Sequence, residues 1–254
     1  MENMALPIFF GFLGLIVGSF LNVIIYRVPN GLSIVWPRSH CPGCGQVLKP
    51  LELIPVISFL LLRGKCRKCQ IPLSWRYPSV EILTGVLFIL VFFFRSERTP
   101  IGILFDFLFI ALLLSLSFID MDYLRLPNVL VGIVALVGLA NALVPGKPNL
   151  IYSLVGALSA GAFFLLIHFL YPEGMGFGDV KLIAAMGLYL GVKAVFASIF
   201  IASFIGLIIE GIKVLTTQKS LRQPIPFGPY LAAGGLILLF FEEYLINFFK
   251  RFVW

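Results

Sequence analysis

Charged residues are scarce in this sequence. Asp, Glu, Lys and Arg make up 12% of its 254 residues, against about 25% in an ordinary soluble domain. Because hydrophobic residues supply 60% of the chain, apolar side chains must cover the outside as well as the interior, which lipid tolerates and water does not. The shortage excludes a large soluble domain, such as a full dinucleotide-binding fold, and predicts an all-α polytopic membrane protein.

Long polar stretches are also few, and they divide the chain into apolar runs. Each run of suitable length predicts one transmembrane helix, about eight in all: residues 5–26, 79–94, 101–119, 126–144, 150–171, 180–192, 194–212 and 230–249. The run at 51–62 is shorter and contains Pro55, so it is predicted to lie at the interface or to re-enter the bilayer. The predicted organisation is a first helix (1–26), a loop (27–78) and a seven-helix bundle (79–254).

The loop at 27–78 carries eight of the 19 basic residues of the chain. Its acidic residue is Glu52, and its eight basic residues are Arg27, Arg38, Lys49, Arg63, Lys65, Arg67, Lys68 and Arg76. The positive-inside rule places this loop in the cytoplasm and the N-terminus outside. The first run lacks a preceding basic residue and a small-residue cleavage site, which predicts a retained helix. The net charge of +7 favours an anionic leaflet of the lipid bilayer as partner, with no nucleic acid.

The chain has only four cysteines, and all of them lie in this loop. They form two CxxC pairs separated by 21 residues: Cys41 with Cys44, and Cys66 with Cys69. Two such pairs can supply the four thiolates of a structural zinc site, and Gly43 and Gly45 suit the tight turn that this requires. Two disulfides are the alternative, which a reducing cytoplasm disfavours.

Acidic residues near the predicted spans are rare, because a charged side chain in a membrane costs free energy, so each one is a candidate for a functional role. Asp120 and Asp122 stand at the inner end of the third run, and Asp179 ends a Gly-x-Gly-Asp motif at the inner start of the sixth. The motif glycines, Gly176 and Gly178, permit close helix approach. Two adjacent carboxylates titrate as a unit and can activate water, as in aspartic proteases. Alternatively, Asp179 is a helix N-cap and the other two are ordinary interfacial acids.

Other polar residues have simpler explanations. Asp106 lies roughly 21 Å of helical rise from Asp120, so it is predicted to serve helix packing or to be hydrated. His168 is predicted to be interfacial. Glu81 is either a substrate or cofactor contact or an interfacial acid beside Arg76. The alternative function is a proton-coupled transporter with the aspartates as a relay, although transporters place such groups near the midplane and often have repeated halves.

Several motifs together carry a resemblance to a known family. In chain order they are Gly18-Ser19-Phe20-Leu21-Asn22-Val23, Tyr26-Arg27-Val28-Pro29, the two cysteine pairs, Ser74-Trp75-Arg76-Tyr77-Pro78-Ser79-Val80-Glu81, Ile119-Asp120-Met121-Asp122, Gly176-Phe177-Gly178-Asp179 and Pro226-Phe227-Gly228-Pro229-Tyr230. The set resembles the prepilin peptidase (type IV leader peptidase) family. The family's frequent Leu-Pro-Asp reads Leu126-Pro127-Asn128 here.

The resemblance implies a GxGD aspartic protease of the bacterial inner membrane. It would remove the basic leader of type IV prepilins or type II secretion pseudopilins and then N-methylate the new terminus with S-adenosylmethionine. The family's two catalytic aspartates map to Asp120 and Asp179, with Asp122 as the accompanying acid. The sequence has no GxGxxG motif after a strand, so it assigns no site to the methyl donor. It does not predict an oligomeric state.

Overall fold

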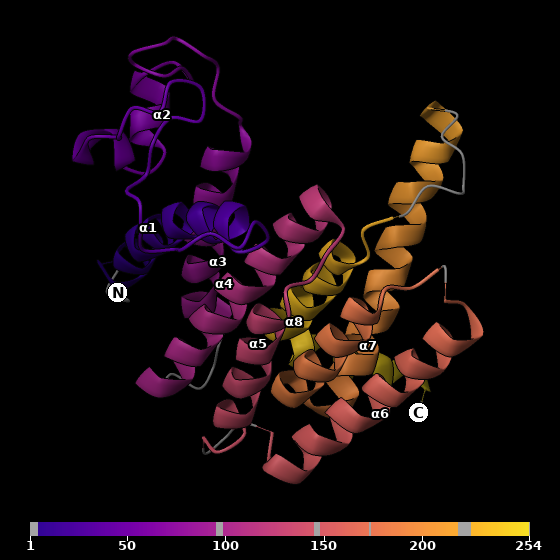
Figure 1. Cartoon of the computed structure of the whole chain (residues 1–254). Helices are drawn as coiled ribbons and strands as arrows, with labels where there is room; N and C mark the ends of the chain where they lie inside the picture. Colours follow the sequence, from indigo (N-terminus) through magenta and orange to yellow (C-terminus); the bar gives the residue numbers. More distant parts are fainter. Residues whose placement is uncertain (1–4, 95–98, 145–147, 173, 218–224, 254) are drawn as a thin grey trace. The chain divides into compact units, whose positions relative to one another are not determined.

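A computed structural model of the chain describes residues 5–94, 99–144, 148–172, 174–217 and 225–253, and most of these residues are helical (Figure 1). Tertiary contacts divide the chain into two compact units, Met1–Phe93 and Phe94–Trp254. The first contains α1 (Ala5–Arg27), the 3-10 helix η1 (Pro50–Leu53), α2 (Ile57–Leu61) and most of α3 (Arg76–Phe94). The second contains α4 (Pro100–Tyr123), α5 (Asn128–Asn141), α6 (Leu150–Leu170), α7 (Phe177–Thr217) and α8 (Gly228–Val253).

The predicted all-α membrane architecture is confirmed. Within the described residues, α1, α3, α4, α6 and α7 are long and apolar enough to cross a membrane, and α5 and α8 are shorter apolar helices. Large apolar side chains on their outer faces are exposed, among them Phe12 and Leu207, which suits a lipid environment. The run at 51–62 forms only the short helices η1 and α2.

Some predicted helix boundaries were wrong. The sixth and seventh runs are both helical, but α7 has its break at Gly191 (φ 77°, ψ 175°), two residues before the predicted one at Lys193. Glycine adopts this conformation without the steric cost of a Cβ. A side chain there would also lie 2.7 Å from the ring of Tyr152. The fourth run is shorter than predicted, because α5 begins only at Asn128, after Pro127.

In the first unit, α1 and α3 pack closely through glycines. A Cβ at Gly14 would lie 2.7 Å from the Cα of Gly85, and one at Gly18 would lie 2.7 Å from the Cα of Glu81. Small residues four positions apart allow two helix backbones to approach in this way. The approach brings Asn22 of α1 beside α3, where its amide nitrogen donates to the carbonyl of Tyr77 at 3.1 Å.

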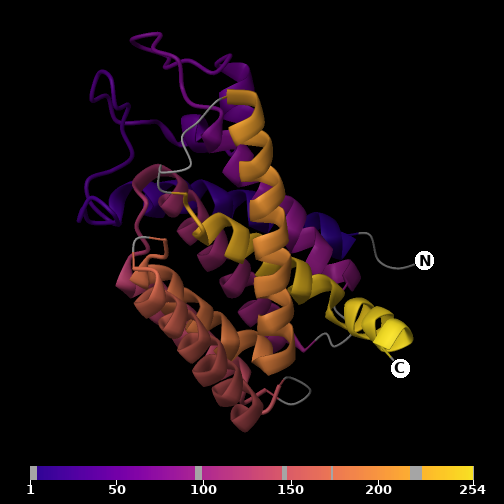
Figure 2. The same ribbon diagram turned by 90° about the vertical axis from the view of Figure 1, so that its right-hand side faces the viewer.

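In the second unit, α7 lies at the centre and contacts α5, α6 and α8. Figures 1 and 2 both show α6 beside the first part of α7. Glycines again allow the approach, since a Cβ at Gly156 of α6 or at Gly187 of α7 would lie 2.7 Å from the partner backbone. This packing holds the first turn of α7, with its Gly-x-Gly-Asp motif, in a defined position.

Candidate active site and metal centre

Asp120 lies in the last turn of α4. The helix continues past the predicted end at Ile119 and stops at Leu124, whose left-handed backbone (φ 51°) lets its N–H donate to the Asp120 carbonyl. The Asp120 side chain is only 6% exposed. Its Oδ2 accepts a 2.9 Å hydrogen bond from the backbone N–H of Gly228, the first residue of α8. Such a donor stabilises negative charge on the carboxylate.

Gly228 has no room for a side chain. A Cβ at this position would lie 2.8 Å from Asp120 Oδ2. Pro229 follows at the start of the helix, where its missing N–H costs nothing. The Pro-Phe-Gly-Pro-Tyr motif therefore brings a backbone donor directly onto one of the two predicted catalytic acids.

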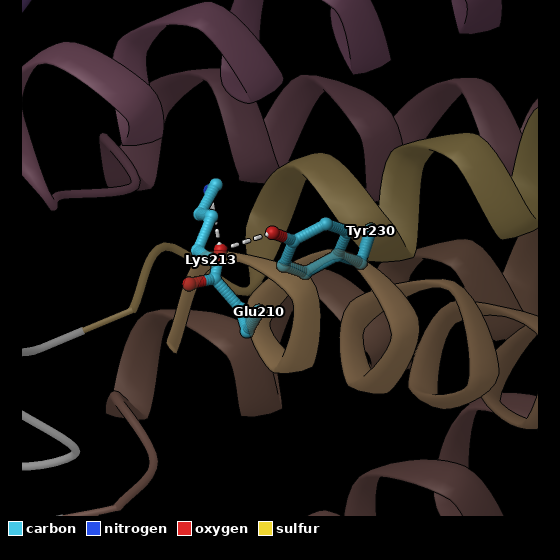
Figure 3. Close-up of polar contacts among 3 residues, drawn as sticks. All are labelled: Glu210, Lys213 and Tyr230. Carbon is cyan, nitrogen blue, oxygen red and sulfur yellow. Dashed lines mark hydrogen bonds and ion pairs between the residues drawn. The ribbon is translucent and has the colours of Figure 1, made fainter. Parts of the chain in front are cut away.

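The start of α8 is fastened to α7 through Tyr230 (Figure 3). Its hydroxyl donates to Glu210 Oε1 at 2.5 Å, and Lys213 contacts the same oxygen at 2.6 Å. The Tyr230 ring lies against Gly206, where a Cβ would be 3.2 Å from it. These contacts fix the helix end that presents Gly228 to Asp120.

Asp179 lies in the first turn of α7, which begins at Phe177. The N-cap interpretation was therefore wrong, because the helix starts before this residue. Its side chain is 8% exposed, and its Oδ1 is buried without a hydrogen-bond partner among the described residues. The carboxyl groups of Asp179 and Asp120 are close enough to repel each other electrostatically. The structure thus brings together the two aspartates that the sequence singled out.

The motif glycines let this turn pack closely. A Cβ at Gly178 would lie 3.1 Å from the Cβ of Leu126, in the segment between α4 and α5. A Cβ at Gly176 would lie 3.2 Å from Asp179 Oδ2. Each of these contacts is tight for a side chain, so both glycines help to bring Asp179 to the end of α4.

Two further contacts hold the same region. The Nδ1–H of His168, in the last turn of α6, donates to the carbonyl of Met175 at 2.8 Å. Lys181 donates to Asn128 Oδ1 at 2.9 Å. His168 therefore restrains the segment before the Gly-x-Gly-Asp motif, and Asn128 of the divergent Leu-Pro-Asn sequence binds the helix that carries Asp179.

The remaining predicted acids have other surroundings. Asp122 is exposed at the end of α4. Asp106 is fully buried within the second unit and accepts a hydrogen bond from the hydroxyl of Tyr189, which suits the predicted role in helix packing. Glu81 belongs to the first unit, where its carboxylate accepts a 2.7 Å hydrogen bond from the N–H of Val56.

The four cysteines form one cluster. All four sulfur atoms lie within 4.8 Å of one another, and Cys41 Sγ is 3.7 Å from Cys69 Sγ. A zinc tetrahedron with Zn–S bonds of about 2.3 Å has sulfur–sulfur edges of about 3.8 Å, whereas a disulfide needs about 2.0 Å. The cysteines are free thiols, so the donor set and its spacing fit a structural zinc and not the disulfide alternative.

The two CxxC turns have the same hydrogen-bond pattern. Cys41 N–H donates to the carbonyl of Gln46, and Cys66 N–H donates in the same way to Ile71. The residue after each pair is left-handed, Gly45 (φ 69°) in the first turn and Gln70 (φ 57°) in the second. We call residues 41–46 and 66–71 the first and second knuckles.

The second knuckle favours a thiolate. Hydrogen bonds from the backbone N–H groups of Cys69 and Lys68 lower the pKa of the Cys66 thiol to about 6. A backbone hydrogen bond from Ile71 lowers the pKa of Cys69, but burial and the neighbouring sulfurs outweigh it and raise that pKa to about 11. A bound cation would remove this repulsion and favour the thiolate at every position.

Sequence reasoning assigned no role to Gly228, Tyr230 or Glu210, although it noted the motif that contains the first two. A glycine directly before a proline at a helix start was the available signal. Glu210 could not be found in this way, because only the packing of α8 against α7 brings it to Tyr230.

The comparisons with known proteins identify the family. Residues 12–94 match the bacterial peptidase A24 N-terminal domain, and residues 107–210 match the type IV leader peptidase family. The chain belongs to the type IV leader peptidase family. No solved structure matches it.

Relatives match over nearly the full chain. A prepilin leader peptidase/N-methyltransferase of Bacillus subtilis is 36% identical, with 94% of this chain and 95% of the relative covered. Proteins of the same name from Aeromonas hydrophila and Neisseria gonorrhoeae are each 36% identical, covering 92% and 89% of this chain and 92% and 87% of the relatives. None of the matches supports the transporter alternative.

Proposed function

We propose that the chain is a membrane aspartic endopeptidase that cleaves the basic leader from type IV prepilins or type II secretion pseudopilins. One observation carries this proposal: two buried carboxyl groups, Asp120 at the end of α4 and Asp179 at the start of α7, lie close enough to interact electrostatically. The name of the relatives, prepilin leader peptidase, suggests the substrate class.

The surroundings of the two acids differ, and the difference suggests which acid accepts a proton and which donates one. Asp120 Oδ2 accepts the Gly228 N–H bond, which stabilises its charged form. Asp179 also has a backbone hydrogen bond, from Gly176, but its Oδ1 is buried with no donor in the described chain, and the repulsion from Asp120 favours its protonated form. We propose that Asp179 holds the proton that the pair shares and acts as the general acid, and that Asp120 is charged and acts as the general base. Asp120 takes a proton from water as the oxygen attacks the scissile carbonyl carbon, and Asp179 protonates the carbonyl oxygen.

The resulting tetrahedral centre collapses when the C–N bond breaks. The leaving nitrogen takes the proton held by Asp120 and departs as the amine, and the hydroxyl proton returns to Asp179, which restores the pair. Water is the only co-reactant, and its two hydrogens and one oxygen end on the new amine and the new carboxyl group.

The site is proposed to work at the cytoplasmic face of the bacterial inner membrane, with the N-terminus outside. The basic loop between α1 and α3 favours this orientation through the positive-inside rule. A prepilin would then enter with its basic leader in the cytoplasm and its apolar helix in the bilayer, which puts the scissile bond at the level of the aspartates.

A second activity, N-methylation of the new terminus, is proposed because the relatives are also named N-methyltransferases. S-adenosylmethionine would supply the activated methyl group for this reaction. The chain offers fitting residues in the first unit, where Asn22 has a buried acceptor oxygen without a partner among the described residues and Glu81 is a buried carboxylate.

The cysteine cluster is proposed to hold a structural Zn²⁺, because it fills all four tetrahedral positions with sulfur and leaves none open for substrate. The zinc would hold the two knuckles together within the loop. No catalytic step is assigned to it.

Substitution of the acids tests the peptidase proposal. Asp120→Asn and Asp179→Asn should each reduce prepilin cleavage by at least about 1,000-fold, while each protein elutes and unfolds like the wild type. Asp122→Asn is the matched control and should retain most of the activity. Cleavage at the wild-type rate by either single variant of the pair would overturn the assignment.

A further inference from the structure

Helix α2 leaves an apolar face exposed in the loop between α1 and α3. Ile57, Leu60 and Leu61 are 52%, 60% and 78% exposed. Residues at positions i, i+3 and i+4 share one side of a helix, so these three side chains form one surface, which we call the outer face of α2. The 3-10 helix η1 contacts α2 and exposes Leu51 in the same way. Because water disfavours a cluster of large apolar side chains, we expect another surface to cover this face.

The opposite face of α2 is packed inside the first unit. Phe59 is buried, and together with Ser58 and Leu62 it lines a cavity of about 320 Å³. Asn22 of α1 and Glu81 of α3 line the same cavity. One face of α2 therefore belongs to the interior of the unit, and the exposed outer face is directed away from it.

Two contacts hold α2 beside the start of α3. The ring of Phe59 meets the ring of Trp75 edge-on, with centroids 5.0 Å apart. The N–H of Val56, directly before α2, donates to the Glu81 carboxylate at 2.7 Å. Since α3 begins at Arg76 and is long and apolar enough to cross a membrane, these contacts place α2 where α3 enters the bilayer. Tryptophan is enriched at that depth, which suits the exposed Trp75.

The charges that follow the outer face are positive. Arg63 and Lys65 come directly after α2, and both are exposed. The acidic residue of the loop, Glu52, accepts a 2.7 Å hydrogen bond from the N–H of Lys49. Apolar side chains next to lysine and arginine are typical of helices that lie in the membrane interface, and an anionic leaflet attracts such cations. Because α1 and α3 tether both ends of the loop to the bilayer, lipid is the surface nearest to hand.

We propose that the outer face of α2 lies in the headgroup region of an anionic phospholipid leaflet. Ile57, Leu60 and Leu61 insert among the first carbons of the acyl chains, and Arg63 and Lys65 bind the lipid phosphates. The contact holds α2, and the cavity behind it, at a fixed depth beside α3. This membrane contact is independent of the two proposed enzyme activities.

Tryptophan fluorescence of the full-length protein in lipid nanodiscs tests the contact. The native tryptophans, Trp36, Trp75 and Trp254, are first replaced by phenylalanine. Leu61→Trp should then lose about half of its emission when the lipid carries bromine near the headgroup end of its acyl chains. The matched control is Val47→Trp, at an exposed apolar residue of the same loop outside α2, which should keep its emission.

Zinc content and prepilin cleavage show whether each of these variants is folded. Emission from Leu61→Trp that brominated lipid does not quench would overturn the contact. Equal quenching of Leu61→Trp and Val47→Trp would overturn the assignment of the contact to the outer face.

Limited proteolysis of the wild-type protein gives a second measurement that needs no substitution. Trypsin cleavage after Arg63 and Lys65 should be about tenfold slower in nanodiscs of phosphatidylcholine mixed with phosphatidylglycerol than in phosphatidylcholine alone. Cleavage after Arg38, an exposed arginine of the loop outside α2, is the control and should change little. Equal rates after Arg63 in the two lipids would overturn the anionic contact. Protection that depends on protein concentration would assign the face to a second copy of the chain and overturn the lipid contact.

Discussion

The cysteine cluster and the aspartate pair are built in different ways. Each knuckle is a local turn of six residues, closed by hydrogen bonds within itself, and the two knuckles bring their four sulfurs within 4.8 Å of one another. The aspartate pair needs the ends of three helices, and the backbone donor to Asp120, Gly228, lies 108 residues further along the chain. A local site tolerates changes elsewhere in the chain, whereas a site assembled from distant helices depends on every contact that aligns them.

The largest expected effect is the loss of the metal from the local site. Cys66→Ser should lower bound zinc from one ion per chain to near none, because a structural zinc site contributes on the order of 10 kcal/mol. The loop at 27–75 should then become sensitive to limited proteolysis. Atomic absorption and mass spectrometry of the fragments measure both effects, and a variant that still holds one zinc would contradict the four-sulfur site.

Acid should weaken the same site. The Cys66 thiol, with its pKa lowered to about 6, is deprotonated at neutral pH and takes up a proton as the pH falls through that value. Zinc must then displace a further proton, so the affinity falls as the pH falls. Zinc titrations at pH 7.5 and pH 5.5 measure the change, and equal affinities would contradict it.

At the distant site, Gly228→Ala should reduce prepilin cleavage by about 100-fold. The new Cβ would lie 2.8 Å from Asp120 Oδ2, so the backbone must move and the N–H donor with it, and loss of one such donor typically costs at least this much. Steady-state cleavage measures the loss. Gly211→Ala of α7 is the matched control, since nothing lies within 4 Å of its Cβ position, and an equal loss in both would contradict the explanation.

A smaller effect is expected from the contact that fastens α8 to α7. Tyr230→Phe keeps the ring on Gly206 and removes the hydroxyl that donates to Glu210. Only part of the hydrogen-bond energy, about 1.5–3 kcal/mol for a charged acceptor, reaches Gly228, so cleavage should fall about fivefold. Tyr244→Phe, an exposed tyrosine of the same helix, should leave the rate unchanged, and a wild-type rate for both would show that the anchor does not matter.

The smallest expected effect is a change in the free energy of unfolding, and it tests whether the two knuckles are equivalent. Gln70 occupies the left-handed position that Gly45 occupies in the first knuckle. Gln70→Gly should therefore raise the free energy of unfolding by about 1 kcal/mol, despite the loss of its 3.3 Å bond to the Arg67 carbonyl. Denaturant unfolding with zinc present measures the change, and Gly45→Ala should shift it the other way. Destabilisation by Gln70→Gly would show that the knuckles are not equivalent.

The sequence by itself determined the helical membrane architecture and the cysteine cluster, because each depends on residues that are close together in the sequence. Apolar runs mark the helices, since lipid requires every backbone group to be paired within its own segment. The spacing of Cys41, Cys44, Cys66 and Cys69 marks the knuckles, because each pair is closed by its own turn.

Only the tertiary structure decided how the distant residues meet. It placed Gly228 on Asp120, put Asp179 in the first turn of α7 and not at the alternative N-cap position, and brought Asn22 and Glu81 to one cavity. Glycine contacts between helices set these distances. The hydropathy of a sequence does not determine which helix faces pack against each other. Only the packing of the helices therefore fixed these contacts.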